Sequence, residues 1–273
     1  MLENVEAIKL RIKTLKDKYC FKIYKTFHIP EFLDPKGITL DNNKNIFISD
    51  ALGNKVFRIS FEGLILSEFS KANYTIPFMN IVFSNLTGVL ISYFDKGGIG
   101  IITDDSIEDW IKINERCAGM CLSPDGSLYV CFSLDNKILK IRNKKIETII
   151  DYGHQNIFST VIGVIGNEIG LSVNNTGEIF KINDNGNLTF FSKCNDFPFS
   201  SFKTFEDKVY ILSARKFIFC YNLNGKLNWQ IELEKIGIVA PKDFDVQRID
   251  GEPAMVLLEH TKNLIHFIKL ATK

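Results

Sequence analysis

The stretch "DPKGITLDNNKNIFISDALGNKVFRIS", residues 34–60, decides the fold. It contains three short apolar runs, "GITL", "IFIS" and "VFRI", which are separated by polar segments rich in Asp and Asn. Asn, Asp and Gly tolerate the positive φ angles that tight hairpins need. The pattern therefore predicts three consecutive antiparallel strands.

The same unit recurs along the chain. Its first apolar run begins near residues 37, 79, 118, 161, 201 and 242, so the successive intervals lie between 39 and 43 residues. In five of the six units a further turn leads to a fourth β-rich run, such as "NLTFFS" or "KLNWQIEL". Four short strands in about forty residues are typical of a propeller blade, whereas a helical repeat would show apolar spacing near 3.6 residues. The sequence predicts an all-β fold, a six-bladed β-propeller with four-stranded blades.

The two ends of the chain predict how the ring closes. The sixth unit has three β-rich runs, and an additional run, "FKIYKTFHI" at residues 21–29, precedes the first unit. A ring without exposed edges forms if this N-terminal strand is the outer strand of the last blade. We therefore expect one propeller domain over residues 21–273.

Residues 1–20 have a different pattern. Their apolar side chains recur at spacings of three and four, which predicts a short amphipathic N-terminal α-helix with a basic flank. Such a helix either packs on the propeller, or binds a partner or a membrane surface.

Composition narrows the function classes. The 33 basic residues are balanced by 32 acidic ones, which disfavours nucleic-acid binding through a basic face. No apolar run has the length of a signal peptide core or a membrane span, so we expect a cytoplasmic protein whose six cysteines are reduced thiols.

Residues 35–63, "PKGITLDNNKNIFISDALGNKVFRISFEG", resemble an NHL repeat. The shared pattern is Pro-x-Gly-Ile, an Asp at the end of the inner strand, and Ile-x-Ile-Ser-Asp in the second strand. The match is partial in "GMCLSPDGSLYVCFS" and "TGEIFKINDNG". The resemblance implies a propeller, and NHL-like propellers include protein-binding modules, RNA-binding modules and lyases. The chain is also distantly similar to the gluconolactonase and regucalcin propellers, which hold a divalent metal in the channel.

In this topology one face carries the connections between blades and the loops between second and third strands. We expect function on this face and at the channel mouth. The predicted function is a non-catalytic binding or scaffold module for a protein or peptide, without a cofactor. The face is predicted to include Lys36, Asp50, Asn80, Arg116, Lys203, Arg215, Asp243 and His260.

Charge on this face refines the prediction. Lys96, Lys242 and Lys262 add to its basic residues, which favours an acidic peptide or a phosphorylated ligand. Asp50 recurs at the equivalent loop positions as Asp95 and Asp135. These carboxylates either cap their own turns or form a cation-attracting rim.

The alternative function is a metal-dependent lactonase or lyase with Ca²⁺ or Zn²⁺ in the channel. Oxygen ligands suit calcium, and His suits zinc. The available ligands would be Asn80, Asp243, His154 and His260.

Two further features have two interpretations each. Cys117, in a predicted interblade loop, is either a nucleophile with His154 as its base or a half-buried loop thiol. The segment "NDFPFSSFKTF", residues 195–205, is either an apolar patch for a peptide or a set of phenylalanines that pack between blades.

Overall fold

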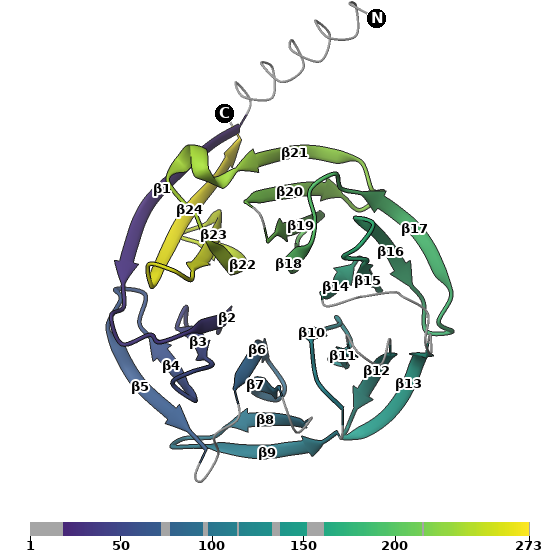
Figure 1. The fold of residues 1–273 in the computed structure, drawn as a ribbon, viewed down its shortest axis with the longest axis horizontal. Coiled ribbons are helices and arrows are strands. Elements are labelled where there is room, and N and C mark those ends of the chain that lie inside the picture. Colours follow the sequence, from purple (N-terminus) through teal and green to yellow (C-terminus); the bar gives the residue numbers. More distant parts are fainter. Residues whose placement is uncertain are drawn as a thin grey trace, which may run out of the picture.

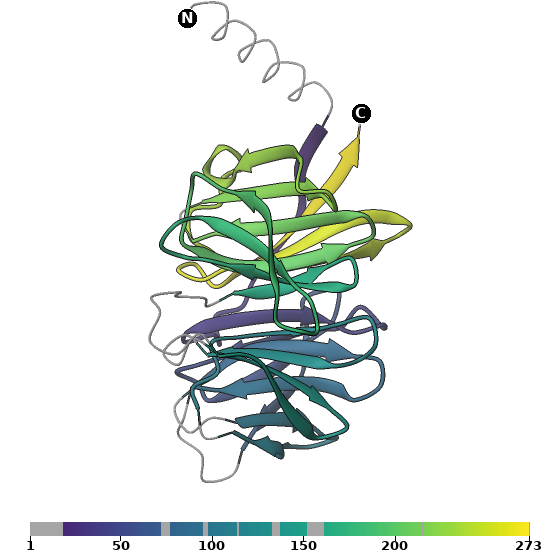
Figure 2. The ribbon, with the colours of Figure 1, turned by 90° about the vertical axis from the view of Figure 1, so that its right-hand side faces the viewer.

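Each predicted repeat folds into a four-stranded antiparallel sheet in the computed structural model of the protein, and the six sheets are arranged as the blades of a propeller (Figure 1). The structure describes residues 19–71, 77–94, 98–113, 115–132, 137–151, 161–214 and 216–272. The predicted N-terminal helix lies outside these residues, except that Tyr19 and Cys20 belong to a strand. The ring is seen from its edge in Figure 2.

Blades 1 to 3 follow one another along the chain. Blade 1 consists of β2 (Pro35–Leu40), β3 (Ile46–Asp50), β4 (Lys55–Ile59) and β5 (Ile65–Ser70). Blade 2 consists of β6 (Phe78–Ser84), β7 (Gly88–Tyr93), β8 (Gly98–Ile102) and β9 (Ile107–Lys112). Blade 3 consists of β10 (Gly119–Leu122), β11 (Leu128–Phe132), β12 (Lys137–Arg142) and β13 (Lys145–Asp151).

Blades 4 to 6 complete the ring. Blade 4 consists of β14 (Ile162–Ile165), β15 (Glu168–Ser172), β16 (Glu178–Ile182) and β17 (Leu188–Lys193). Blade 5 consists of β18 (Phe199–Phe205), β19 (Lys208–Ser213), β20 (Phe217–Asn222) and β21 (Leu227–Glu232), and a 3₁₀ turn, η1 (Leu233–Ile236), follows it. Blade 6 consists of β22 (Pro241–Ile249), β23 (Glu252–Glu259), β24 (Leu264–Thr272) and, as its outer strand, β1 (Tyr19–His28).

The predicted closure by the N-terminal strand is therefore confirmed. β1 pairs antiparallel with β24 from Tyr19 opposite Thr272 to His28 opposite Leu264, so the first and last strands share one ladder. Phe267 of β24 packs edge-on against Phe27 of β1, with ring centroids 5.5 Å apart. Each buried phenylalanine contributes roughly 1.5–3 kcal/mol, so the seam is held by packing as well as by backbone hydrogen bonds.

Apolar side chains between neighbouring blades form the core. The ring of Phe202 in β18 lies over Gly163 and Gly170 of blade 4, where an added Cβ would be 2.3 Å and 2.5 Å from its atoms. Phe199 and Phe202 are each 3% exposed. The phenylalanines of residues 195–205 thus serve interblade packing at these two positions, which is the second of the two interpretations above.

The two faces of the ring differ in the segments they carry. The loop face carries the interblade connections and the loops between second and third strands, and the turn face carries the turns that join first to second and third to fourth strands. The inner strands β2, β6, β10, β14, β18 and β22 surround the central axis (Figure 1). Among the described residues, no helix is long and apolar enough to cross a membrane.

Candidate functional site

β-bulges shape the loop-face mouth of the channel. Where an inner strand begins, its register against the second strand shifts at Lys36 in β2, at Ser200 in β18 and at Lys242 in β22. A shift of the same kind spans Met79 and Asn80 in β6. A bulge adds one residue to one strand and redirects its side chain. These bulges place side chains from four blades at one end of the channel.

These residues line one cavity of about 280 Å³. Its charged lining residues are Lys36, Lys203, Lys242 and Asp243, and its apolar part includes Phe94 and Phe199. Of the predicted face residues, the structure thus brings together Lys36, Asn80, Lys203 and Asp243. We call this cavity the loop-face mouth.

Lys36 is held in place by an acidic residue on the adjoining loop. Its amine lies 2.6 Å from an oxygen of Asp34, and Nε2 of His260 lies 2.5 Å from the same oxygen. Burial would raise the pKa of Asp34, but Lys36 and His260 outweigh it and hold this pKa below its usual value. His260 therefore reaches the mouth only indirectly, through Asp34.

Lys242 lies beside Lys36 without such a partner. In the part of the chain that the structure describes, its amine takes part in no hydrogen bond or ion pair, and the residue is half-buried. Burial lowers the pKa of Lys242, and the charge of Lys36 lowers it further, against the weaker pull of Asp243 and Asp34. The mouth therefore includes a lysine that forms no ion pair with any described residue.

Lys203 is the deepest of the three lysines, and two acidic residues surround it. Burial on its own would lower the pKa of Lys203, but Asp243 and Asp245 raise it above the ordinary value. Burial also raises the pKa of Asp243, yet its oxygens accept N–H bonds from Ile38 and Phe244, each of 2.8 Å. These bonds stabilise the Asp243 carboxylate, and the nearby charge of Lys203 acts in the same direction, against burial.

The same acidic residues join the last blade to the first. Oδ2 of Asp245 accepts an N–H bond of 3.0 Å from Leu40, and Oδ2 of Asp243 accepts the bond from Ile38. Both donors belong to β2, whose inner edge has no neighbouring strand. The two carboxylates thus satisfy backbone groups at an inner sheet edge.

The channel has a second half, which opens on the turn face. This cavity of about 460 Å³ is lined by Thr39, Thr204, Glu206 and Asp245, among others. Among the described residues, only Met120, Phe202 and Lys203 line both halves. Lys203 therefore lies where the two halves meet.

Other predicted face residues lie elsewhere. Asp50 is completely buried and accepts N–H bonds from Leu33 and Asp34, each of 2.7 Å, and from Gly53, so it caps its loop. Arg116 is exposed at the rim, with its guanidinium 5.6 Å from the ring centre of Phe94. Arg215 and His154 lie outside the described residues.

The donors for a metal are few at this mouth. The amide nitrogen of Asn80 donates a bond of 2.6 Å to the carbonyl of Ala118, and the Asp243 carboxylate is engaged as described above. Calcium takes six to eight oxygen ligands. Among the described residues, no three His, Cys, Asp or Glu side chains gather in a way that could hold a metal ion. The described residues alone therefore do not fit a divalent metal site.

Cys117 is not placed as a nucleophile. It is completely buried, and burial raises the pKa of its thiol to about 11. A thiol with such a pKa is almost fully protonated at neutral pH, so it has little reactive thiolate. The geometry fits the interpretation as a structural loop thiol.

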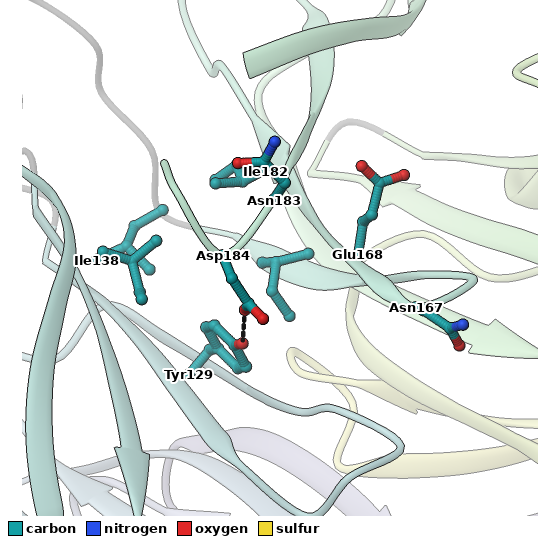
Figure 3. A pocket seen from close by; sticks show the side chains of 9 residues that line it. Tyr129, Ile138, Asn167, Glu168, Ile182, Asn183 and Asp184 are labelled. Atoms are coloured by element: carbon teal, nitrogen blue, oxygen red, sulfur yellow. Dashed lines mark hydrogen bonds between the residues drawn. The ribbon is translucent and has the colours of Figure 1, made fainter. Parts of the chain in front are cut away.

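A separate cavity of about 170 Å³ lies between blades 3 and 4 on the turn face (Figure 3). Isoleucines line part of it, and Tyr129 donates a hydrogen bond of 3.2 Å to Asp184. The amine of Lys140 donates to the same carboxylate oxygen at 2.9 Å. The Lys140 amine beside this cavity is thus paired with a carboxylate, in contrast to the amine of Lys242.

Two features of this site are not predicted by the strand pattern. The first feature is the set of β-bulges. Strand alternation predicts which face a residue lies on, but it does not show where a strand carries an extra residue. The other is a serine near the end of the second strand, in "IFIS", "VLIS", "IGLS" and "VYILS". Ser49, Ser92, Ser172 and Ser213 are completely buried, and Ser49 accepts from Gly37 and donates to the carbonyl of Met79. Ser49 thus ties the start of its inner strand to the next blade, whereas Ser172 bonds to the carbonyl of Val161 before its own inner strand.

Comparison with known proteins supports the same class of fold. No family model and no curated protein matches the sequence. Among solved structures, virginiamycin B lyase from Staphylococcus aureus is similar, with a TM-score of 0.69 and 15% identity over 92% of this chain and 100% of that chain. A gluconolactonase from Xanthomonas campestris has a TM-score of 0.72 and 9% identity over 94% of this chain and 93% of that chain.

A third similar structure is regucalcin, a calcium-binding protein from Agrobacterium tumefaciens, with a TM-score of 0.70 and 9% identity over 93% of this chain and 95% of that chain. At these identities the likeness shows the fold alone. The chain is thus a six-bladed β-propeller, and its structural neighbours include the gluconolactonase and regucalcin group that the sequence resembles. The relation to NHL repeats stays a prediction.

Proposed function

We propose that this propeller is a binding module that holds an acidic segment of a protein partner at the loop-face mouth. One observation carries the proposal. Lys36, Lys203 and Lys242 line the mouth, and Asp243, the acidic residue in its lining, is engaged by backbone N–H groups. The lining thus carries three lysines and one aspartate, and a concave site with an excess of charge of one sign attracts ligands of the opposite sign.

The side chains around the mouth favour a protein segment as the ligand. Leu33 and Leu52 are each 67% exposed, and the backbone of Leu33 is bonded to Asp50, whose loop carries Leu52. Exposed apolar side chains beside a charged cavity suit a segment with both apolar and acidic residues. Arg116 adds a further cation at the rim, next to Phe94.

The test uses a fluorescein-labelled peptide of alternating Glu and Leu residues. Its controls are a matched peptide with Gln in place of Glu and a phosphoserine version. Fluorescence anisotropy should show binding of the Glu peptide that is about tenfold tighter than that of the Gln peptide and that weakens with salt. Phosphoserine should increase the affinity further.

Substitutions locate the binding. Lys36→Met and Lys242→Met should each weaken the binding of the Glu peptide. Lys226 is an exposed lysine in the β20–β21 turn, so Lys226→Met should leave the binding unchanged. Equal affinity for the Glu and Gln peptides would contradict the proposal. So would an unchanged affinity in both mouth variants.

A metal-dependent lactonase or lyase stays the alternative. Asn80 and Asp243 line the same cavity, although the described residues alone do not make up a complete metal site. The distinguishing measurement is elemental analysis of protein purified without chelator or histidine tag, paired with thermal melts with and without EDTA. Near-stoichiometric calcium or zinc and a melt that depends on EDTA would favour the enzyme over the binding module.

A further inference from the structure

The turn-face half of the channel is apolar on the side of blades 2 to 4. This cavity of about 460 Å³ is lined by residues of all six inner strands. On this side its lining includes the apolar residues Val82, Phe83, Met120, Leu122 and Val164. Phe83, Leu122 and Val164 are half-buried, so part of their surface is open to a ligand. None of the described lining residues of these three blades is charged, which suits an aliphatic or aromatic group.

The side of blades 5, 6 and 1 carries the charges of this cavity. The inner strands of these blades, β18, β22 and β2, lie across the axis from β6, β10 and β14 (Figure 1). The charged residues among the described lining are Lys203, Glu206 and Asp245. Lys203 and Asp245 are close enough for their charges to interact, and Glu206 pairs with Arg248. With one lysine and two carboxylates, this side does not favour a simple anion, in contrast to the loop-face mouth.

The hydrogen bonds of this charged side leave both donor and acceptor positions open. Oδ2 of Asp245 accepts from the N–H of Leu40 and the hydroxyl of Thr39, at 3.0 Å and 3.3 Å. Oδ1 accepts one bond of 2.9 Å, from the N–H of Val246. A carboxylate oxygen can accept two bonds, so Oδ1 keeps a position for a further donor. In the described part of the chain, the amine of Lys203 takes part in no hydrogen bond or ion pair, so its N–H groups can donate to a ligand.

We infer that the turn-face half binds a free α-amino acid with an apolar side chain, such as leucine. The carboxylate of the amino acid accepts from Lys203, and its ammonium group donates to Oδ1 of Asp245. The apolar side chain packs against Leu122 and Val164 on the opposite side of the cavity. A zwitterion is neutral overall and gives each of the two charges a charged partner. This site is separate from the loop-face mouth, so the inference goes beyond the proposed function and does not depend on it.

A series of ligands tests the charged side without any substitution there. Isothermal titration calorimetry on the full-length protein compares L-leucine with isocaproate, which lacks the ammonium group, and with isoamylamine, which lacks the carboxylate. Leucine should bind at least about tenfold more tightly than either analogue, because each analogue leaves one charged group without its partner. Glycine, which has both charges but no side chain, should also bind about tenfold more weakly than leucine. Equal affinities of leucine and isocaproate, or no measurable binding of leucine, would overturn the inference.

A substitution on the apolar side locates the site. Val164→Phe adds a large side chain to the cavity lining and should weaken leucine binding by at least about tenfold. Val239→Phe is the matched control, because Val239 is 53% exposed on the loop face and should leave the affinity unchanged. Thermal melts check that both variants are folded, and the ligand series remains decisive if Val164→Phe is not. An unchanged affinity for leucine in folded Val164→Phe would refute this site.

The same variants separate this inference from the proposed function. Among the described lining residues, Val164 belongs to the turn-face half and not to the mouth, and Lys36 belongs to the mouth and not to the turn-face half. Val164→Phe should therefore leave the affinity for the Glu peptide unchanged, and Lys36→Met should leave the affinity for leucine unchanged. Binding of the Glu peptide without binding of leucine would refute the inference and leave the proposed function. Binding of leucine without binding of the Glu peptide would do the reverse.

Discussion

Two cavities of this propeller place a lysine in opposite environments. At the loop-face mouth, burial and Lys36 lower the pKa of Lys242. Between blades 3 and 4, contacts with Tyr129 and Asp184, which Figure 3 labels, raise the pKa of Lys140. Both side chains are partly buried, so burial alone does not decide the outcome. The difference lies in the partners: one amine faces a cation, and the other faces a carboxylate and a phenol.

The comparison distinguishes a lysine that a carboxylate of the protein pairs with from a lysine that has no ion pair and can bind a ligand. Lys140 is paired with Asp184 by a hydrogen bond of 2.9 Å, whereas Lys203 is influenced by the nearby charges of Asp243 and Asp245, which raise its pKa. Lys242 is left with a charge that a ligand can neutralise. Binding of an anion there would favour the ammonium form, so we expect binding to take up protons at alkaline pH.

The largest expected effect is at Lys203, where the cation is structural. Lys203→Met leaves Asp243 and Asp245 enclosed without their cation, which should lower the free energy of unfolding by about 3 kcal/mol. Urea unfolding measures this, with Lys140→Met as the control, which should lose less than ~1 kcal/mol. Equal losses in the two variants would remove the distinction between a buried and a surface pair.

The next effect is on binding. The double variant Lys36→Glu/Lys242→Glu reverses two charges of the mouth. It should lower the affinity for the Glu peptide by about 100-fold, or ~2.7 kcal/mol. Lys140→Glu should change the affinity by less than about twofold, because Lys140 pairs with Asp184, which lines the other cavity. Anisotropy titrations at two salt concentrations check this. A similar loss of affinity in Lys140→Glu would show that the net charge of the protein, and not a binding site at the mouth, controls the affinity.

A smaller effect, of opposite sign, concerns stability. A lysine whose pKa is lowered by folding destabilises the folded state while it is charged, so Lys242→Met should stabilise the protein by roughly 1 kcal/mol at neutral pH. The penalty is complete below the folded pKa and vanishes as the pH rises past the unfolded value near 10.4. Urea unfolding should therefore show the gain at pH 7 and a smaller gain near pH 10. If the gain in the free energy of unfolding does not depend on pH, it arises from packing of the methionine and not from removal of the charge.

The smallest effect is at Asp184, which is 76% exposed and pairs with Lys140. Its pKa is lowered, chiefly by Lys140, so its contribution is present above the unfolded value near 3.9 and is lost as the pH falls through the folded pKa. Asp184→Asn should cost less than ~1 kcal/mol at neutral pH, and the two proteins should converge in acid. A pH series of thermal melts measures the difference, and a constant gap down to strongly acidic pH would contradict it.

The repeat was predictable because strand alternation and turn composition are local. The blade starts near residues 37, 79, 118, 161, 201 and 242 lie in or next to the inner strands, and the strand predicted at residues 21–29 is β1, which begins two residues earlier at Tyr19. Asp50, by contrast, was assigned to the binding face and is buried in its loop. Its carboxylate bonds to Leu33 and Asp34, which lie in the preceding loop and approach it only in the folded blade.

The sequence by itself determined the class of fold, the number of blades and the strand that closes the ring, because a period near forty residues and two-residue alternation are written along the chain. The folded ring decided which lysines line the loop-face mouth. Lys36 and Lys242 are about two hundred residues apart in sequence, and they meet only because blades 6 and 1 are neighbours and both strands bulge at these positions. A pKa depends on burial and on charges a few ångströms away, and both are set when the ring closes.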